Sequence, residues 1–347
     1  MLTHPAGALH ARRGFTIIEL IFLILVVAVL MIWLLLPAIS VRGDTRNIVS
    51  QANLRSLGAM YANYAEDNDD WIATLPPDPA KAREDVIRIL AKQTGRGIED
   101  GSAGQLLRLE SPILPSIRYQ SLPLMEYITA QLPEYILASP YDRKLQEWQD
   151  DPVFAVQDGH VPFVAGKSDQ FPELATPDVQ QLWPYGSSYQ MVAAAWNPND
   201  NSGPTKSWLP RLDTPHQFDR SSDAEAPHGQ RRRYAEVVFP SGKVMMYEEF
   251  DWTTKNGPRW NTADGASVNV AFFDGSVRYL KAADFNPGAS PETSGSDPFV
   301  QRFQTFGNYP AGVPARHQAG DSPLRFRWTR AGLGGIDIGG REVRTND

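Results

Sequence analysis

The chain has 347 residues, 42% of them hydrophobic, and a formal net charge of −7 at pH 7. An acidic surface is a poor general binder of nucleic acid, so we expect no nucleic-acid partner. The chain contains no cysteine, which excludes disulfides and thiolate chemistry. Its 28 prolines and 27 glycines indicate that loops make up much of the structure.

An unbroken apolar run lies near the N-terminus. Residues 15–36 contain a single ionisable side chain, that of Glu19. About 20 apolar residues cross the hydrocarbon core of a bilayer, so the sequence predicts a transmembrane helix here. Arg12 and Arg13 come directly before it, and positive charges favour the cytoplasmic side. We therefore expect a single-pass protein of the inner (cytoplasmic) membrane, with its N-terminus in the cytoplasm and its bulk in the periplasm.

The residues at the start of this run indicate how the chain is processed. A secretory signal places small residues after its apolar segment, whereas here Gly14 comes before it. The order Arg13-Gly14-Phe15, with Glu19 four positions further on, resembles the N-terminal signal of type IV pilins and type II secretion pseudopilins. The resemblance implies that prepilin peptidase cleaves between Gly14 and Phe15 and methylates the new amine of Phe15.

Glu19 has two interpretations. A carboxylate in hydrocarbon is costly without a partner. The resemblance implies that the partner is the amine of Phe15, on the same chain or on a neighbouring subunit of a filament, which makes Glu19 an assembly residue. The alternative is that Glu19 lies at the depth of the lipid headgroups, where it costs little.

The chain stays compatible with a helix beyond the apolar run. Leu54, Leu57, Tyr61 and Tyr64 recur at spacings of three and four, which places them on one helical face. We predict that this face packs on a globular head. If residues 15–65 form one nearly continuous helix, that helix is about 75 Å long.

Two stretches near the C-terminus predict β-strands. Residues 243–249 are short, apolar and preceded by a turn signal. Residues 268–273 and 276–280 alternate in polarity and are joined by Asp274-Gly275. This pattern predicts a β-hairpin with a type I′ turn, in which both central residues have positive φ.

The hairpin extends the resemblance to pilin-like proteins. Planctomycete-type prepilin-like proteins have a C-terminal region named for a His, nine residues and Asp-Gly. Here Asp264 stands at the position of that His, with nine residues between it and the Asp-Gly of the hairpin. Residues 53–58, after the apolar run, also resemble this family, as do residues 137–142 and 186–190.

These features together predict an α+β, pilin-like fold with a long N-terminal helix, a small antiparallel sheet and a loop-rich insertion. The predicted parts follow one another along the chain: a leader (1–14), a transmembrane and filament-core helix (15–36), a helical stalk (37–66), a loop-rich insertion of the head (67–235), and a C-terminal β-sheet region with the hairpin and a terminal arm (236–347). Within the insertion we predict helices near Ala80–Lys92 and Leu122–Leu132. We expect residues 326–347 to pack loosely or to form the arm.

Several acidic residues lie near the predicted strands. Glu248, Glu249, Asp251, Asp264 and Asp274 would approach one another if the strand at 243–249 lies beside the hairpin. Carboxylate oxygens suit Ca²⁺, and some pseudopilins bind calcium near the C-terminus, so we keep a calcium site as a hypothesis. A glycosidase pair is a second interpretation of the same carboxylates, and a turn residue is a sufficient role for Asp274.

The sequence carries no zinc-ligand spacing, no nucleophile elbow and no complete phosphate loop. We therefore expect a non-enzymatic subunit of a type II secretion or type IV pilus-like filament, with calcium as its one candidate cofactor. The expected partners are prepilin peptidase, other pilin or pseudopilin subunits and the assembly platform of the inner membrane. The alternatives are a membrane-anchored extracytoplasmic module that binds carbohydrate or another envelope polymer, and a tethered hydrolase.

Overall fold

The chain divides into two compact units, residues 1–46 and 47–347. The computed structural model describes the following residues: 16–74, 84, 88, 120–125, 127–128, 132–150, 185–196, 231–254, 258–263, 265–288, 325–327 and 329–341. It describes the backbone alone at residues 32–44, 144, 193 and 260.

Helix α1 (Ile17–Asp67) has 51 residues and contributes to both units. In the second unit, Leu54, Leu57 and Tyr61 are fully buried, on the face that their spacing predicted. The helix ends at Asp67, and Asp70, shortly after it, adopts a left-handed backbone conformation (φ 67°). The backbone N–H of Asp70 donates at 2.7 Å to the carbonyl of Ala65 in the last helical turn, which is a common way to satisfy that carbonyl.

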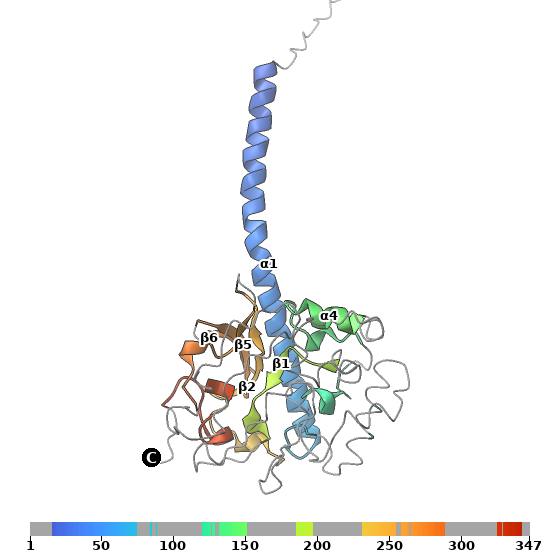
Figure 1. Cartoon of the computed structure of the whole chain (residues 1–347), viewed down its shortest axis with the longest axis vertical. Helices are drawn as coiled ribbons and strands as arrows, with labels where there is room; N and C mark the ends of the chain where they lie inside the picture. Colours follow the sequence, from blue (N-terminus) through green and yellow to red (C-terminus); the bar gives the residue numbers. More distant parts are fainter. Residues whose placement is uncertain are drawn as a thin grey trace, which may run out of the picture. The chain divides into compact units, whose positions relative to one another are not determined.

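Four antiparallel strands form the main sheet, in the order β1-β2-β5-β6 (Figure 1). The strands are β1 (Tyr189–Met191), β2 (Val244–Glu248), β5 (Ser267–Phe272) and β6 (Val277–Lys281). The strand predicted at 243–249 is therefore present as β2, and it pairs with the predicted hairpin through β5. A second, two-stranded sheet follows, formed by β3 (Phe250–Asp251) and β4 (Arg259–Trp260). Together with α1 these sheets make the fold α+β.

The hairpin has a different turn from the predicted one. Gly275 has a positive φ of 80°, whereas Asp274 does not, so a type I′ turn is wrong. The N–H of Gly275 donates to the carbonyl of Phe272 at 2.9 Å, and the N–H of Phe272 donates to the carbonyl of Ser276 at 2.9 Å. The loop therefore has three residues, 273–275. It consists of a β-turn over residues 272–275 whose last residue, Gly275, is in the left-handed region. The glycine alone supplies the backbone freedom.

The sheet of the second unit is covered on both faces. Glu248 of β2 contacts α1 through Ser50, while the neighbouring Tyr247 packs on Phe326 with ring centroids 5.0 Å apart. Consecutive strand residues point to opposite faces, so α1 and the C-terminal segment lie on opposite sides of the sheet. This explains why β2 is buried along its whole length.

The region between α1 and β2 has little regular structure among its described residues. The helix predicted at Leu122–Leu132 is wrong over residues 122–125, where only the short η2 (Leu122–Leu124) forms, with a proline in its first turn. Most of the helix predicted near Ala80–Lys92 lies outside the described residues. The sequence pattern did not predict α4 (Arg143–Asp150) or β1. The remaining described helices are single 3₁₀ turns: η3 (Tyr135–Leu137), η6 (Ala193–Ala195), η8 (Tyr234–Glu236), η9 (Ala282–Asp284), η11 (Arg325–Arg327) and η12 (Gly332–Gly334).

The C-terminal segment is tightly packed over its described residues, 325–327 and 329–341, so the prediction of loose packing or a free arm is wrong there. Phe326 and Leu333 are fully buried. A Cβ on Gly335 would lie 2.0 Å from the backbone oxygen of Arg330. Glycine at this position therefore allows close packing of the backbone. The glycine content of this segment did not indicate loose packing.

Candidate functional site

The N-terminal end of α1 carries the first of the predicted site residues. Gly14 and Phe15, the predicted processing site, lie outside the described residues. Glu19 lies in the first helical turn, where its Oε2 accepts hydrogen bonds from the backbone N–H and the hydroxyl of Thr16, both at 2.9 Å. The N–H of Glu19 in turn donates to the Thr16 hydroxyl at 3.3 Å. These reciprocal bonds form a capping box, which satisfies N–H groups that begin a helix without partners.

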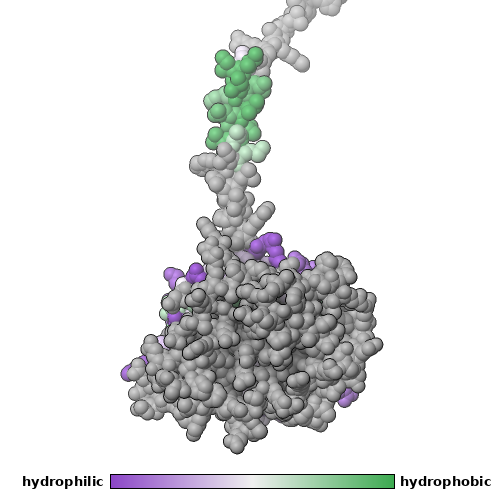
Figure 2. Space-filling view, in the orientation of Figure 1, coloured by the Kyte–Doolittle hydropathy of each residue, from purple (hydrophilic) through white to green (hydrophobic). Residues whose placement is uncertain are grey.

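The N-terminal part of α1 exposes apolar side chains around its circumference. Ile17, Ile18 and Phe22 are 77%, 79% and 68% exposed, and Leu30 and Met31 are about as exposed. Figure 2 shows this part of α1 as hydrophobic. Exposed apolar surface of this kind marks contact with another protein or with lipid.

The predicted transmembrane segment extends beyond the residues whose side chains are described. Phe15 precedes them, and residues 32–36 are described by their backbone alone. Within the described residues, no helix combines the length and the apolar character that crossing a membrane requires.

A buried carboxylate, that of Glu248, forms the most densely bonded polar group between α1 and the sheet. Its Oε1 accepts hydrogen bonds from the hydroxyls of Ser50 at 2.5 Å and Ser139 at 3.1 Å. Its Oε2 accepts from the backbone N–H and the side-chain amide of Asn269, at 3.2 and 2.9 Å. The Tyr189 hydroxyl lies 3.0 Å from that of Ser50. Three other segments thus meet at the Glu248 side chain, and a fourth joins the cluster through Ser50.

Burial controls the ionisation of this cluster. Burial raises the pKa of Glu248, against hydrogen bonds from Ser50, Asn269 and Ser139 that favour the charged form. Burial and the nearby carboxyl of Glu248 also raise the pKa of Tyr189. Glu248 is 3% exposed and Ser50 is fully buried, so no substrate reaches these oxygens in this conformation. The physical effect of the cluster is to join α1 to the sheet.

The other acidic residues of the calcium hypothesis occupy separate environments. Glu249 follows β2 and is buried, and Asp251 in β3 accepts hydrogen bonds from Thr253 and Ser267. Asp274 lies in the hairpin turn, where it accepts a hydrogen bond from the N–H of Ser276 at 2.9 Å.

Asp264, the remaining residue of that set, lies outside the described residues. In the described part of the chain, no three His, Cys, Asp or Glu side chains are grouped closely enough to hold a metal ion. The calcium site stays a hypothesis.

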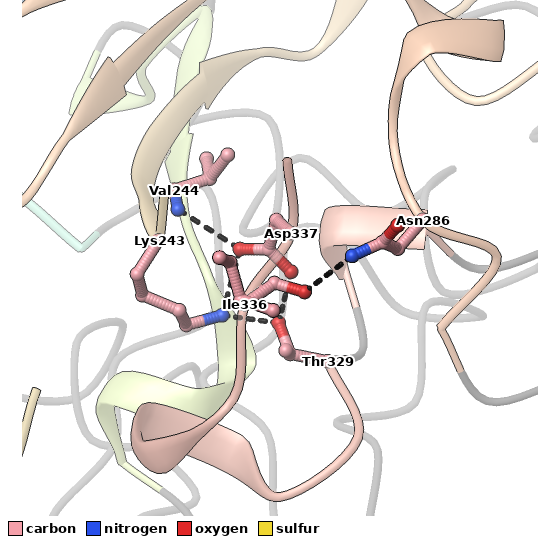
Figure 3. A network of polar contacts seen from close by, with 6 residues as sticks. All are labelled: Lys243, Val244, Asn286, Thr329, Ile336 and Asp337. Carbon is pink, nitrogen blue, oxygen red and sulfur yellow. Dashed lines mark hydrogen bonds and ion pairs between the residues drawn. The ribbon is translucent and has the colours of Figure 1, made fainter. Parts of the chain in front are cut away.

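A second buried polar cluster ties the C-terminal segment to β2 (Figure 3). The Lys243 ammonium, which is fully buried, lies 2.9 Å from Oδ2 of Asp337 and also donates to the Thr329 hydroxyl. Oδ2 of Asp337 accepts the backbone N–H of Val244 at 2.9 Å. Burial lowers the pKa of Lys243, and the charge of Asp337 opposes that shift.

The sequence pattern did not predict the cluster around Glu248, although two of its members lie in segments that the sequence analysis singled out. Ser139 belongs to residues 137–142 and Tyr189 to residues 186–190. The structure brings these segments together, with the N–H of Ser188 donating to the carbonyl of Leu137 at 2.9 Å.

Comparisons with known proteins add no relative: no protein-family model, no curated protein and no solved structure matches this chain.

Proposed function

We propose that the chain is a pilin-like or pseudopilin-like subunit that prepilin peptidase cleaves between Gly14 and Phe15. The mature subunit is held in the inner membrane by its N-terminal helix and is recruited by the assembly platform. It then enters a filament of the type II secretion or type IV pilus kind, with its head in the periplasm. The proposal assigns the chain an assembly role without catalysis.

The observation that carries this proposal is the N-terminal part of α1. A helix with apolar residues on all sides is stable when lipid or other helices surround it. The exposed side chains of Ile17, Ile18 and Phe22 therefore support a helix that packs among copies of itself and within a membrane. The order of Gly14, Phe15 and Glu19 along the sequence supports processing at that end.

The Thr16–Glu19 capping box gives Glu19 a local role in addition to the proposed one. Both described donors reach the same oxygen, Oε2, and come from Thr16. Cleavage after Gly14 would place a charged amine one residue before Thr16. In the proposed subunit, Glu19 both caps the N-terminus of the helix and pairs with the amine of its own or a neighbouring chain.

The direct test of processing is mass spectrometry of the mature N-terminus from membranes of the native host. We expect a chain that begins with N-methylated Phe15. An intact leader, or cleavage after the apolar run, would contradict the proposal.

The role of Glu19 is tested by two substitutions that separate charge from capping. Glu19→Gln keeps an oxygen that accepts from Thr16, whereas Glu19→Val removes it. If pairing with an amine drives assembly, both variants are cleaved normally but are absent from sheared, sedimented filaments. Normal incorporation of Glu19→Gln would leave capping as the only role of the residue. Glu66→Gln, on an exposed position of α1, is the matched control.

A further inference from the structure

Trp71 contacts two arginine side chains at the surface of the second unit. The guanidinium carbons of Arg231 and Arg233 lie 4.6 and 4.4 Å from the centroid of its ring. These distances are typical of cation–π contacts. The backbone holds the group in place, since Trp71 and Arg233 form an antiparallel bridge and the N–H of Ile72 donates to the carbonyl of Arg232 at 2.7 Å.

The three consecutive arginines differ in their surroundings. Arg232 is buried and its guanidinium pairs with Glu236 at 2.5 Å. Arg231 and Arg233 are exposed, and no carboxylate of the described residues lies within ion-pair distance of either guanidinium, although the charge of Arg233 acts on Glu236. Two ordered positive charges are thus presented to solvent by a chain that is acidic overall.

We propose that Trp71, Arg231 and Arg233 form a binding site for an acidic polysaccharide. A guanidinium that lies on an aromatic ring keeps its N–H edge free, and that edge matches a carboxylate with two parallel hydrogen bonds. Residues two apart in an extended chain are about 7 Å apart, so the site presents two such edges to successive acidic sugars.

The choice of ligand follows from the small size of the site. Single-stranded nucleic acid is densely charged and is bound by several aromatic residues within a long basic groove. The site offers one aromatic residue and two cations, which is too few for such a groove. A polysaccharide with carboxylates and intervening neutral hydroxyls fits this arrangement better. The site does not depend on the assembly role proposed above.

The test measures binding of polygalacturonate to the full-length chain in neutral detergent micelles by isothermal titration calorimetry, with dextran as the neutral polymer. We expect saturable binding to polygalacturonate and none to dextran. Arg231→Gln/Arg233→Gln is expected to weaken binding by about tenfold or more, because it removes two charge-assisted contacts. Arg231→Lys/Arg233→Lys keeps the charge but removes the paired N–H donors of the guanidinium, and we expect an intermediate loss of affinity.

Arg278→Gln is the matched control, because Arg278 also lies on an aromatic ring, 4.3 Å from the centroid of Phe272, and is 41% exposed. Unlike the arginines of the site, it has Asp274 at 4.0 Å. We expect less than about a twofold change for this variant, whose effect on net charge is that of one site arginine. Three results would overturn the proposal: no binding by the wild-type chain, a loss with Arg278→Gln as large as that with Arg231→Gln/Arg233→Gln, or tighter binding of single-stranded DNA than of polygalacturonate. The lysine variant decides the case if the glutamine pair lowers the melting temperature.

Discussion

Glu248 carries its carboxyl group in the buried interior of the second unit. A raised folded-state pKa means that the folded chain binds this proton more tightly than the unfolded chain. The contribution of Glu248 to stability is therefore greatest at low pH and declines as the pH rises from the ordinary carboxyl value through the folded pKa. Above that pKa, the folded structure has to hold a buried charge.

The substitution Glu248→Gln tests this sign. Glutamine is neutral at every pH and still presents an oxygen and an amide to Ser50, Ser139 and Asn269. We expect the free energy of unfolding to fall less steeply between pH 4.5 and pH 7.5 in Glu248→Gln than in the wild type. Urea unfolding at a series of pH values measures this slope. Equal slopes would contradict it, and Glu66→Gln, an exposed carboxyl on the same helix as Ser50, is the control.

At the scale of elements, the hairpin of β5 and β6 depends on one backbone conformation. Gly275 has a φ of 80°, and a Cβ there would meet no atom within 4 Å, so the cost of a side chain is conformational and not steric. Gly275→Ala is expected to lower the free energy of unfolding by about 1–2 kcal/mol. Gly275→Asn is expected to cost less, since asparagine adopts this conformation more readily. Chemical denaturation compares the two, and equal stability of Gly275→Ala and wild type would refute this account of the turn.

The hairpin was predictable because its signal is local. Alternating residues on both sides of Asp274-Gly275 indicate two paired strands, and β5 and β6 match them closely. The exact turn was not predictable, since Asp-Gly is compatible with both a two-residue and a three-residue loop. β1 has only three residues, and its position depends on pairing with β2, more than fifty positions away.

The candidate sites also divide into those with a local sequence signal and those that depend on distant residues. The Thr16–Glu19 pair is four residues of sequence, and the Glu19 signal was visible at once. Glu248 stood out as an acidic residue at the end of an apolar strand, but its partners come from three other segments. Lys243 begins the predicted strand and is fully buried, and its partner Asp337 lies in the segment that was expected to pack loosely or to form a terminal arm.

At the scale of the second unit, the Lys243–Asp337 pair joins the start of β2 to the C-terminal segment. Lys243→Met removes one buried charge and leaves Asp337 without compensation. Breaking a buried pair in this way typically costs about 3–5 kcal/mol. We expect a loss of that size in thermal or urea unfolding.

The double variant Lys243→Met/Asp337→Asn separates the charge from the packing. It removes both charges while keeping an oxygen for the N–H of Val244, so we expect it to be more stable than Lys243→Met alone. Lys281→Met, at an exposed lysine that ends β6, is the control and should change stability by less than about 0.5 kcal/mol. If Lys243→Met were no worse than this control, the ion pair would contribute little to closing the C-terminal segment.

The residues that contact one another at Glu248 are synthesised at different times. Ser50 is made early, and Glu248 follows it by 198 residues. At the usual rate of translation, about 5–20 residues per second, the helix waits roughly 10–40 s for the strands that cover it. Leu54, Leu57 and Tyr61, which are fully buried in the finished structure, have no sheet to pack against during that interval. The nascent chain therefore exposes an apolar helical face for much of its synthesis. A holding chaperone that recognises apolar helices would bind this face during that interval.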